Sequence, residues 1–240
     1  FPMNENLAAP KSGNLQIRLL GSPQISIDNL PLTGLTSAKA QALLFYLAVT
    51  AREHTRTTLA ALLWGELPDE KARGNLRKAL QQLRNQIGGH LSIDRYTIAI
   101  QENAGCWTDV VEFREILQEF KVSEESDKIQ RALDLYRGDF LEGFYVRKAP
   151  DFENWWLAER ARLRELMLKC LHTLAEYRAE QGKLEEAIAL TRRYLVLEPW
   201  REETHRRLMT WLAHSGQRGA ALTQYEVCRQ ILADELQVEP

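Results

Sequence analysis

The stretch ARGNLRKALQQLRNQIGG, residues 72–89, gives the strongest indication of the fold of this chain. Leucine, alanine and isoleucine recur in it at spacings of three and four residues, which is the pattern of an amphipathic helix. Asp69 and Glu70 lie just before this stretch, where the positive end of a helix dipole favours carboxylates. Gly88 follows the last apolar position, and glycine favours the end of a helix. These signals together predict a helix over residues 69–87.

The predicted helix has one apolar face and one polar face without carboxylates. Its apolar stripe consists of Leu76, Ala79, Leu80, Leu83 and Ile87. At about 100° per residue, the opposite face presents Gly74, Lys78, Gln81 and Asn85, flanked by Arg77, Gln82 and Arg84, with Arg73 one turn earlier. Such side chains carry donors that read guanine and adenine edges in the major groove, and the basic ones neutralise phosphates. This face predicts binding to duplex DNA, with an ordinary solvated helix as the alternative.

The residues before this helix predict short strands followed by two helices. Leu15, Ile17, Leu19, Ile25 and Ile27 alternate with polar residues around Gly21-Ser22-Pro23, which is typical of a β-hairpin or a short meander. Thr36 or Ser37 is expected to cap a helix that buries Ala40, Leu43, Leu44 and Leu47. Thr57 is expected to cap a second, short helix with Leu59, Leu62, Leu63 and Trp64 pointing inward, ended by Gly65 and Pro68.

A second β-hairpin is predicted directly after the polar helix. Its two alternating runs contain Leu91 and Ile93 on one side, and Tyr96, Ile98 and Ile100 on the other. A hairpin in this position is the wing of a winged helix. Arg95 lies at its tip, where it is expected to contact a phosphate or the minor groove.

From residue 109 onward the pattern is almost entirely helical. A long helix is expected over residues 152–181. Four residue pairs recur at a spacing of 34: Leu174 and Leu208, Tyr177 and Trp211, Gly182 and Gly216, Ala187 and Ala221. That period is typical of tetratricopeptide helix pairs, in which the glycine ends the first helix and the alanine allows close packing of the second.

Charge is distributed unevenly along the chain, although the formal net charge is −2. Residues 1–95 carry 11 Lys and Arg against 7 Asp and Glu, a balance of +4, whereas residues 96–240 carry 20 against 26, a balance of −6. Residues 71–95 alone hold six basic residues against one acidic residue. A local positive excess of this kind suits a surface that faces a polyanion.

Several classes of protein are excluded by what the sequence lacks. It has no run of 18 apolar residues and no secretory signal, so neither a membrane span nor export is expected. Cys106, Cys170 and Cys228 lie far apart, as free thiols do in a reducing cytosol, and we expect a cytoplasmic protein. The five histidines lack zinc spacing, and no phosphate-binding loop or nucleophile motif occurs. We therefore expect neither an enzyme nor a bound metal or cofactor.

The order of these elements resembles the OmpR-like winged helix, and more closely the version in the Streptomyces antibiotic regulatory protein family. Three motifs carry this resemblance: Leu20-Gly21 near the first strand, Leu62-Leu63-Trp64 at a helix end, and the NLRKALQQLR run from Asn75 to Arg84. The resemblance implies that residues 69–87 form the recognition helix. It also implies a loop that faces RNA polymerase, containing Gly65, Glu66, Asp69 and Glu70. The wing departs from the family because it is short and lacks the frequent glycine at its tip.

The second half resembles the bacterial transcriptional activator domain, which is the partner domain in the same family. The motifs that carry this resemblance are Asp109 with Phe113, ALDLYRGDFLEGF at residues 132–144, Trp156 with Glu159-Arg160, Glu198-Pro199, His205-Arg206 and Ala220-Ala221-Leu222. The resemblance covers residues 15–240. Family members commonly continue past this domain, and we expect this chain to be part of a longer protein.

These observations predict a mainly α protein with an N-terminal winged helix-turn-helix that contains small β-sheets, and a C-terminal all-α tetratricopeptide-like domain. We expect residues 1–13 to be a disordered, tag-derived tail, residues 14–105 the OmpR-like DNA-binding domain and residues 106–240 the bacterial transcriptional activator domain. The predicted function is that of a DNA-binding transcription regulator, an activator, whose helical domain mediates homodimerisation or relays a signal. The alternatives are a protein-interaction scaffold that does not bind DNA, and an enzyme whose site forms only in a longer chain.

Overall fold

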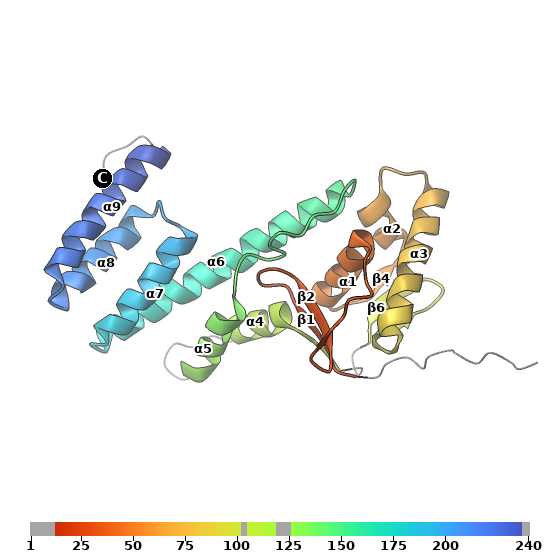
Figure 1. Cartoon of the computed structure of the whole chain (residues 1–240), viewed down its shortest axis with the longest axis horizontal. Helices are drawn as coiled ribbons and strands as arrows, with labels where there is room; N and C mark the ends of the chain where they lie inside the picture. Colours follow the sequence, from red (N-terminus) through yellow and green to blue (C-terminus); the bar gives the residue numbers. More distant parts are fainter. Residues whose placement is uncertain (1–12, 102–104, 119–125, 237–240) are drawn as a thin grey trace, which may run out of the picture. The chain divides into compact units, whose positions relative to one another are not determined.

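The computed structural model describes residues 13–101, 105–118 and 126–236, and residues 1–12 of the predicted tail lie outside this part (Figure 1). The described residues fall into two compact units. The first contains residues 13–118 and 131–163, and the second contains residues 126–130 and 164–236. The predicted mainly α fold, with small sheets in the N-terminal part, is confirmed.

A small sheet near the N-terminus forms one layer of the first unit. It consists of β1 (Leu15–Arg18), β2 (Gln24–Ile27), β3 (Leu30–Pro31) and β7 (Cys106–Thr108), in the order β3-β2-β1-β7. β1 pairs antiparallel with β2, as the alternating pattern predicts, and parallel with β7. Gly21 makes the turn between β1 and β2 with φ of 109°, a conformation that favours glycine. The predicted meander is confirmed, whereas the parallel strand was not foreseen.

Three helices follow the meander. They are α1 (Ala38–Thr50), α2 (Arg56–Trp64) and α3 (Asp69–Ile87). Of the two candidates for the cap of α1, Ser37 is the residue whose side chain accepts a hydrogen bond from the N–H of Ala40. The predicted bounds of α3 are confirmed at both ends.

Two expectations about α2 were wrong. Its cap is Thr55, not Thr57, and the Thr55 side chain accepts a hydrogen bond from the N–H of Thr58. The reason is that β4 (His54–Thr55) pairs with a distant strand and holds Thr55 in extended conformation at the point where the helix begins. Leu62, which was expected to point inward, is only half-buried.

The predicted wing follows α3. Gly88 does not end the helical path at once, because a short 3-10 turn, η1 (Gly88–His90), continues it. β5 (Leu91–Ile93) and β6 (Thr97–Ile100) then form the hairpin, and β4 completes a sheet in the order β4-β6-β5. The wing is therefore tied by its second strand to the segment that caps α2.

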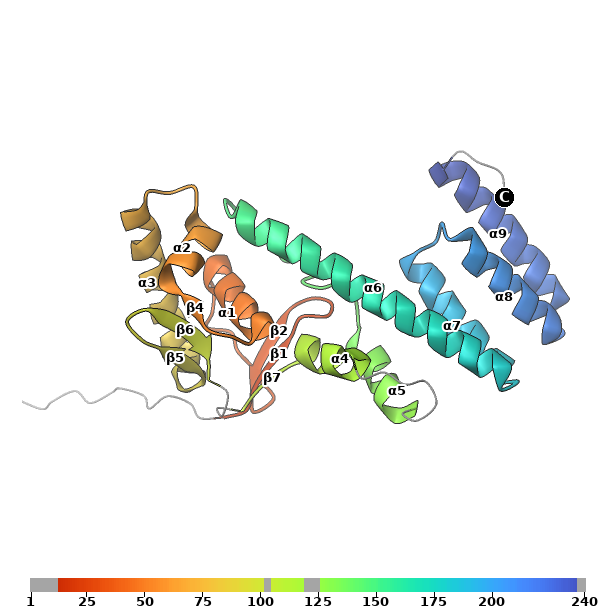
Figure 2. The same cartoon turned by 180° about the vertical axis from the view of Figure 1, so that it is seen from behind.

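Helix α1 lies at the centre of the first unit. Most of its residues are buried around its whole circumference, which is typical of a core helix and not of a surface helix. It packs against α2, α3 and β6, and Figure 2 shows it enclosed by these elements. The rings of Phe45 and Phe144 meet edge to face at 5.1 Å, and those of Tyr46 and Trp155 at 4.8 Å.

Residues after the wing complete the same unit. α4 (Asp109–Gln118) begins with a buried aspartate whose carboxylate accepts the N–H groups of Leu19 at 2.8 Å and Leu20 at 3.0 Å. Gly21 donates its N–H to the carbonyl of Asp139, and Leu141 donates to that of Leu19. The predicted domain boundary at 105/106 falls between β6 and β7, inside this unit. As a division between independently folding domains it stays a prediction.

The remaining helices are α5 (Ser126–Leu135), α6 (Pro150–Glu180), α7 (Leu184–Leu197), α8 (Glu202–His214) and α9 (Arg218–Leu236). α6 matches the long helix expected over residues 152–181 to within two residues. Gly182 and Gly216 have φ of 75° and 82°, so each takes the left-handed conformation that ends the preceding helix. The core of the second unit contains Ala175, Ala187, Ile188, Leu208, Trp211 and Leu212. The predicted tetratricopeptide-like repeats are confirmed.

We expect Asp109→Ala to lower the free energy of unfolding by about 2–5 kcal/mol, because it leaves the buried N–H groups of Leu19 and Leu20 without a partner. Urea-induced unfolding followed by circular dichroism measures this loss. The matched control is Asp234→Ala, an exposed aspartate, which should change stability by less than about 0.5 kcal/mol. Equal stability of both variants would contradict the role given to the Asp109 carboxylate.

Candidate nucleic-acid interface

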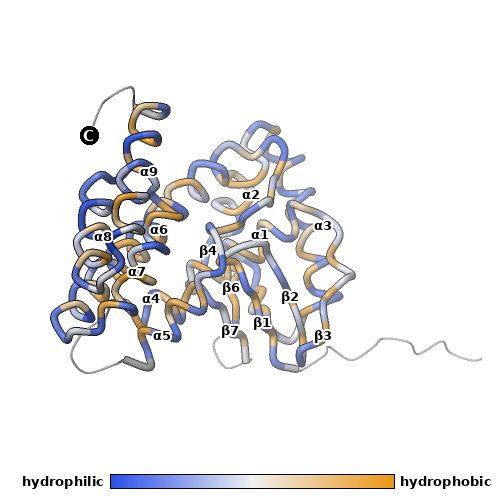
Figure 3. The backbone as a smooth tube through the Cα atoms, turned by 60° about the vertical axis from the view of Figure 1, so that its left-hand side comes forward, coloured by the Kyte–Doolittle hydropathy of each residue, from blue (hydrophilic) through white to orange (hydrophobic). Residues whose placement is uncertain are grey.

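The polar face of α3 is open to solvent. All eight residues predicted to contact DNA are exposed: Arg73, Arg77, Lys78, Gln81, Gln82, Arg84 and Asn85 on α3, and Arg95 in the wing turn. Figure 3 shows hydrophobic and hydrophilic residues alternating along α3. A Cβ atom added to Gly74 would meet no atom within 4 Å, so the helix surface at this glycine is also open. The structure therefore brings the α3 residues together on one exposed surface, as predicted.

The opposite side of α3 is filled by the core. Its buried residues include all five of the predicted stripe: Leu76, Ala79, Leu80, Leu83 and Ile87. α3 packs against α2 and α1 through this side. Because the apolar side is fixed in this way, the rotation of the helix about its axis is set, and the polar face cannot turn inward.

Carboxylates on α3 are confined to its first turn. Asp69 and Glu70 are both exposed there, and Asp69 lies 3.9 Å from the guanidinium of Arg73. Farther along, Gln81 donates its amide N–H to the Asn85 carbonyl oxygen at 3.0 Å. This hydrogen bond holds two amide side chains, the residue type that pairs with adenine, at a defined separation on the exposed face.

The wing turn has no glycine at its tip, and the side chain of an aspartate, Asp94, holds it. The Asp94 carboxylate accepts the N–H of Tyr96 at 2.5 Å and the N–H of Thr97 at 2.6 Å, and it also accepts the Thr97 hydroxyl. These hydrogen bonds, led by the one from the Thr97 N–H, hold the pKa of Asp94 below its usual value. An Asx turn of this kind explains how a tip without glycine can be tight.

Arg56 fastens this turn to the start of α2. Its guanidinium donates from Nε at 3.1 Å and from Nη2 at 2.9 Å to the carbonyl oxygen of Asp94. Its backbone N–H donates to the carbonyl of Tyr96 at 2.9 Å. The wing tip and the first turn of α2 therefore form one structure, although 38 residues separate Arg56 from Asp94 in the chain.

The sequence interpretation did not identify Arg56 or Tyr96 as functional candidates. Tyr96 is 68% exposed, and its ring lies under the Arg95 guanidinium at 5.4 Å. Because the tyrosine supports Arg95, the basic group at the tip is partly ordered before any ligand arrives. The signal that could have revealed this arrangement is the run Asp94-Arg95-Tyr96-Thr97, since aspartate three residues before threonine is typical of a side-chain-capped turn.

The loop between α2 and α3 is exposed and has a fixed base. Gly65 and Glu66 lie in this loop, whereas the structure places Asp69 and Glu70 in the first turn of α3. All four are exposed, as expected for a surface that contacts a partner. At the base, Lys39 lies over the buried Trp64 ring at 5.2 Å, and its ammonium group donates to the carbonyl of Leu63. Burial lowers the pKa of Lys39, while Glu66 opposes this effect. The loop is thus anchored at its α2 end.

The cysteines are poor nucleophiles in this structure. Burial raises the pKa of Cys106 and that of Cys170 to about 11, so both are protonated thiols near neutral pH.

Within the described ranges, no three His, Cys, Asp or Glu side chains lie close enough together to bind a metal ion. In the same part of the chain, no helix combines the length and apolarity needed to cross a membrane.

The fold and its exposed surface define a winged-helix protein whose second part is built of helical-hairpin repeats. Residues 108–240 match the family of the bacterial transcriptional activator domain. This match covers more than half of the chain, and the chain belongs to this family of transcriptional regulators. The predicted resemblance to Streptomyces antibiotic regulatory proteins is confirmed.

The chain is similar in sequence to two bacterial regulatory proteins. The regulatory protein AfsR of Streptomyces coelicolor is 30% identical over 250 residues, covering 100% of this chain and 24% of AfsR. The transcriptional regulator RedD of the same species is 27% identical, covering 95% of this chain and 67% of RedD. The chain thus spans about a quarter of the length of AfsR.

A solved structure has the same fold. EmbR of Mycobacterium tuberculosis, determined in complex with a low-affinity phosphopeptide, superposes with a TM-score of 0.66 at 24% sequence identity. The match covers 95% of this chain and 62% of the EmbR chain. At this level of identity the likeness concerns the arrangement of helices and strands.

Replacing Arg56 by alanine should loosen the wing turn without unfolding the helices. Because it removes both guanidinium hydrogen bonds to Asp94, we expect the amides of Tyr96 and Thr97 to exchange with solvent roughly tenfold faster. Hydrogen exchange followed by NMR measures this rate. Arg52→Ala, which removes an exposed arginine four residues earlier, should leave these amides unchanged. Unchanged exchange in the Arg56 variant would show that the wing turn does not depend on this side chain.

Proposed function

We propose that this chain is a DNA-binding transcription activator that inserts α3 into the major groove of duplex DNA. The observation that carries this proposal is the exposed face of α3 over residues 73–85, which consists of basic and amide side chains and contains no carboxylate. Duplex DNA is the partner whose chemistry fits, because its phosphates attract the basic groups and its base edges accept and donate hydrogen bonds.

The position of each side chain suggests its part in recognition. Lys78, Gln81 and Asn85 lie opposite the buried leucines, so they would face the base edges, with Gln82 beside them. The arginines at the border of the face, Arg73, Arg77 and Arg84, would hold phosphates. Arg95, supported by Tyr96, would contact a phosphate or the minor groove beside the recognition helix.

The helical-repeat part would serve dimerisation or relay a signal. Repeats of this kind present extended surfaces to other proteins. Homodimerisation would suit a regulator that binds two half-sites, since each subunit then places one recognition helix. The opposing proposal, a scaffold that contacts only proteins, would leave the basic face of α3 without a polyanion.

Operator binding tests the main proposal. A bound sequence is first selected from random duplexes, and its affinity is then measured at increasing salt. If about six phosphates are contacted, the affinity should fall on the order of 10³-fold between about 50 and 200 mM salt. Lys78→Glu should abolish binding, because it places a carboxylate against the DNA, and Gln81→Ala should relax the preference at one base pair by about 1–3 kcal/mol.

The control separates recognition from folding. Leu80 is buried, so Leu80→Ala should destabilise the protein by roughly 2–5 kcal/mol and weaken binding only through unfolding. Lys78 and Gln81 are exposed, so their variants should keep the stability of the parent. If both variants bind the selected duplex as the parent does, the polar face of α3 is not the recognition surface. If no duplex is bound at low salt, the scaffold is the better account.

We further propose that the loop with Gly65, Glu66, Asp69 and Glu70 contacts RNA polymerase. Reversing Glu66 and Glu70 to lysine should not weaken operator binding, since added positive charge favours DNA. It should lower transcription from an operator-bearing promoter roughly tenfold, since the acidic residues would face a basic surface of the polymerase and lysines would repel it. In vitro transcription with purified polymerase measures this. Glu53→Lys, a similar change at an exposed glutamate outside the loop, should have no such effect. Equal transcription by both proteins would argue against a polymerase contact at this loop.

A further inference from the structure

A cavity of about 400 Å³ lies within the first unit, away from the polar face of α3. Its walls come from the end of α1, the end of β6, the strand β7 and the first turns of α4. This volume is within the range of small-molecule sites. Its lining residues include none of those predicted to contact DNA or polymerase.

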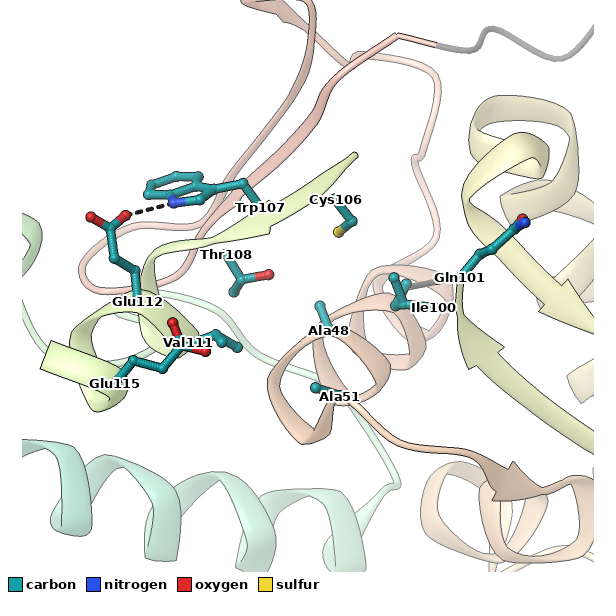
Figure 4. A pocket seen from close by; sticks show the side chains of 10 residues that line it. All are labelled: Ala48, Ala51, Ile100, Gln101, Cys106, Trp107, Thr108, Val111, Glu112 and Glu115. Atoms are coloured by element: carbon teal, nitrogen blue, oxygen red, sulfur yellow. Dashed lines mark hydrogen bonds between the residues drawn. The ribbon is translucent and has the colours of Figure 1, made fainter. Parts of the chain in front are cut away.

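The walls of the cavity are mostly apolar, with a few polar groups. Ala48, Ala51, Ile100 and Val111 supply the apolar surface. Figure 4 shows Cys106 and Thr108, which lie on the same side of β7, converging with Ala48 on the space between β7 and α1. Because alanine side chains are small, the α1 wall leaves room that longer residues would fill. This mixture of apolar wall and isolated polar groups is typical of ligand sites.

The charged side chains that line the described cavity are both carboxylates, Glu112 and Glu115. Glu112 is already engaged, because its carboxylate accepts the indole N–H of Trp107 at 2.6 Å and the Nε of Arg131 at 2.8 Å. The contact with Arg131, above all, holds the pKa of Glu112 below its usual value, so it is ionised at neutral pH. Glu115 is exposed on the next turn of α4. Because the Arg131 guanidinium compensates the charge of Glu112, the exposed carboxylate of Glu115 sets the sign of the charge that a ligand meets. An anionic ligand would be repelled by it, whereas an ammonium group would be attracted.

The cavity is connected to the candidate interface through the backbone. Gln101, which lines it, follows the last residue of β6, the second strand of the wing. The N–H of Gln101 donates at 2.9 Å to the carbonyl of His90, in the turn that ends α3. A molecule bound here would therefore touch the segment that joins the wing to the recognition helix.

We propose that this cavity binds a small amphipathic amine, with its apolar body between α1 and β7 and its ammonium group beside Glu115. The apolar walls, the size of the space and the sign of the lining charge all favour this chemical class. Binding of the amine requires neither DNA nor polymerase, so it can be tested separately from the proposed function.

Three probes with the same apolar body and different charge test the proposal: phenethylamine, phenethyl alcohol and hydrocinnamate. Ligand-observed NMR titration of the full chain should give a dissociation constant of ~1 mM for the amine. We expect the alcohol to bind more weakly and hydrocinnamate at least about tenfold more weakly than the amine, because its carboxylate faces that of Glu115.

Variants locate the bound probe. Glu115→Gln should weaken the amine about two- to fivefold and leave the alcohol unchanged, because only the charge is removed. Val111→Phe should weaken both about tenfold by filling the space, with circular dichroism as the check on folding. The matched control, Glu153→Gln, alters an exposed glutamate outside the cavity and should change nothing.

The following outcomes would overturn the proposal. One is the absence of saturable binding of the amine up to ~10 mM. Another is equal binding of hydrocinnamate and the amine, which would mean that the carboxylates do not select the ligand. A third is an equal effect of Glu115→Gln and Glu153→Gln, which would show that the probe responds to net charge and not to this site.

Discussion

The carboxylate of Asp109 makes the contact on which the first unit depends. It is 1% exposed, it accepts the N–H groups of Leu19 and Leu20 where β1 ends, and Arg137 lies 3.5 Å from it. Burial raises the pKa of Asp109, whereas these hydrogen bonds and the arginine oppose that rise. The contact joins the start of the winged helix to residues about 90 and 120 positions later in the chain. β7 adds to this by pairing with β1, so the winged helix receives part of its sheet from residues that follow the wing.

The orientation of the candidate interface follows from the packing behind it. α1 is buried around its circumference, so it offers α3 an apolar surface on which the leucine stripe packs. The face opposite that stripe must then point away from the core. The wing also packs on α1, through the buried residues of β6. Polar contacts hold it in addition: Arg56 at the start of α2 holds the carbonyl of Asp94, and β4 pairs with β6. α3 and the wing thus share the apolar support of α1, and the turn of the wing is fastened by polar contacts as well.

The parts of the fold that the sequence predicted are those whose signals are local. The bounds of α3 were predicted because its apolar period, its acidic first turn and its terminal glycine lie within about twenty residues. The exposure of Lys78, Gln81 and Asn85 followed from the same period.

The features of the fold that the sequence did not predict depend on pairing between distant segments. Thr55 caps α2 because β4 pairs with β6, and the parallel partner of β1 is a three-residue strand with no periodicity of its own. Arg56 donates to the backbone carbonyl of Asp94, which every residue type carries, so no sequence pattern reveals this contact.

Arginines have different surroundings on α3 and on the helices of the second unit, and their ion pairs show the difference. In the second unit, arginines lie beside glutamates: Arg178 is 3.1 Å from Glu186, and Arg207 is 2.9 Å from Glu203. There the charges of each pair compensate one another. On α3, the ion pair found among the described residues is that of Arg73 with Asp69, at 3.9 Å and largely exposed. The basic groups farther along α3 have no carboxylate on their own face, so their positive electrostatic potential extends into the solvent. An overall charge of −2 therefore conceals an exposed basic face, because the local field depends on where charges are left uncompensated and not on their sum.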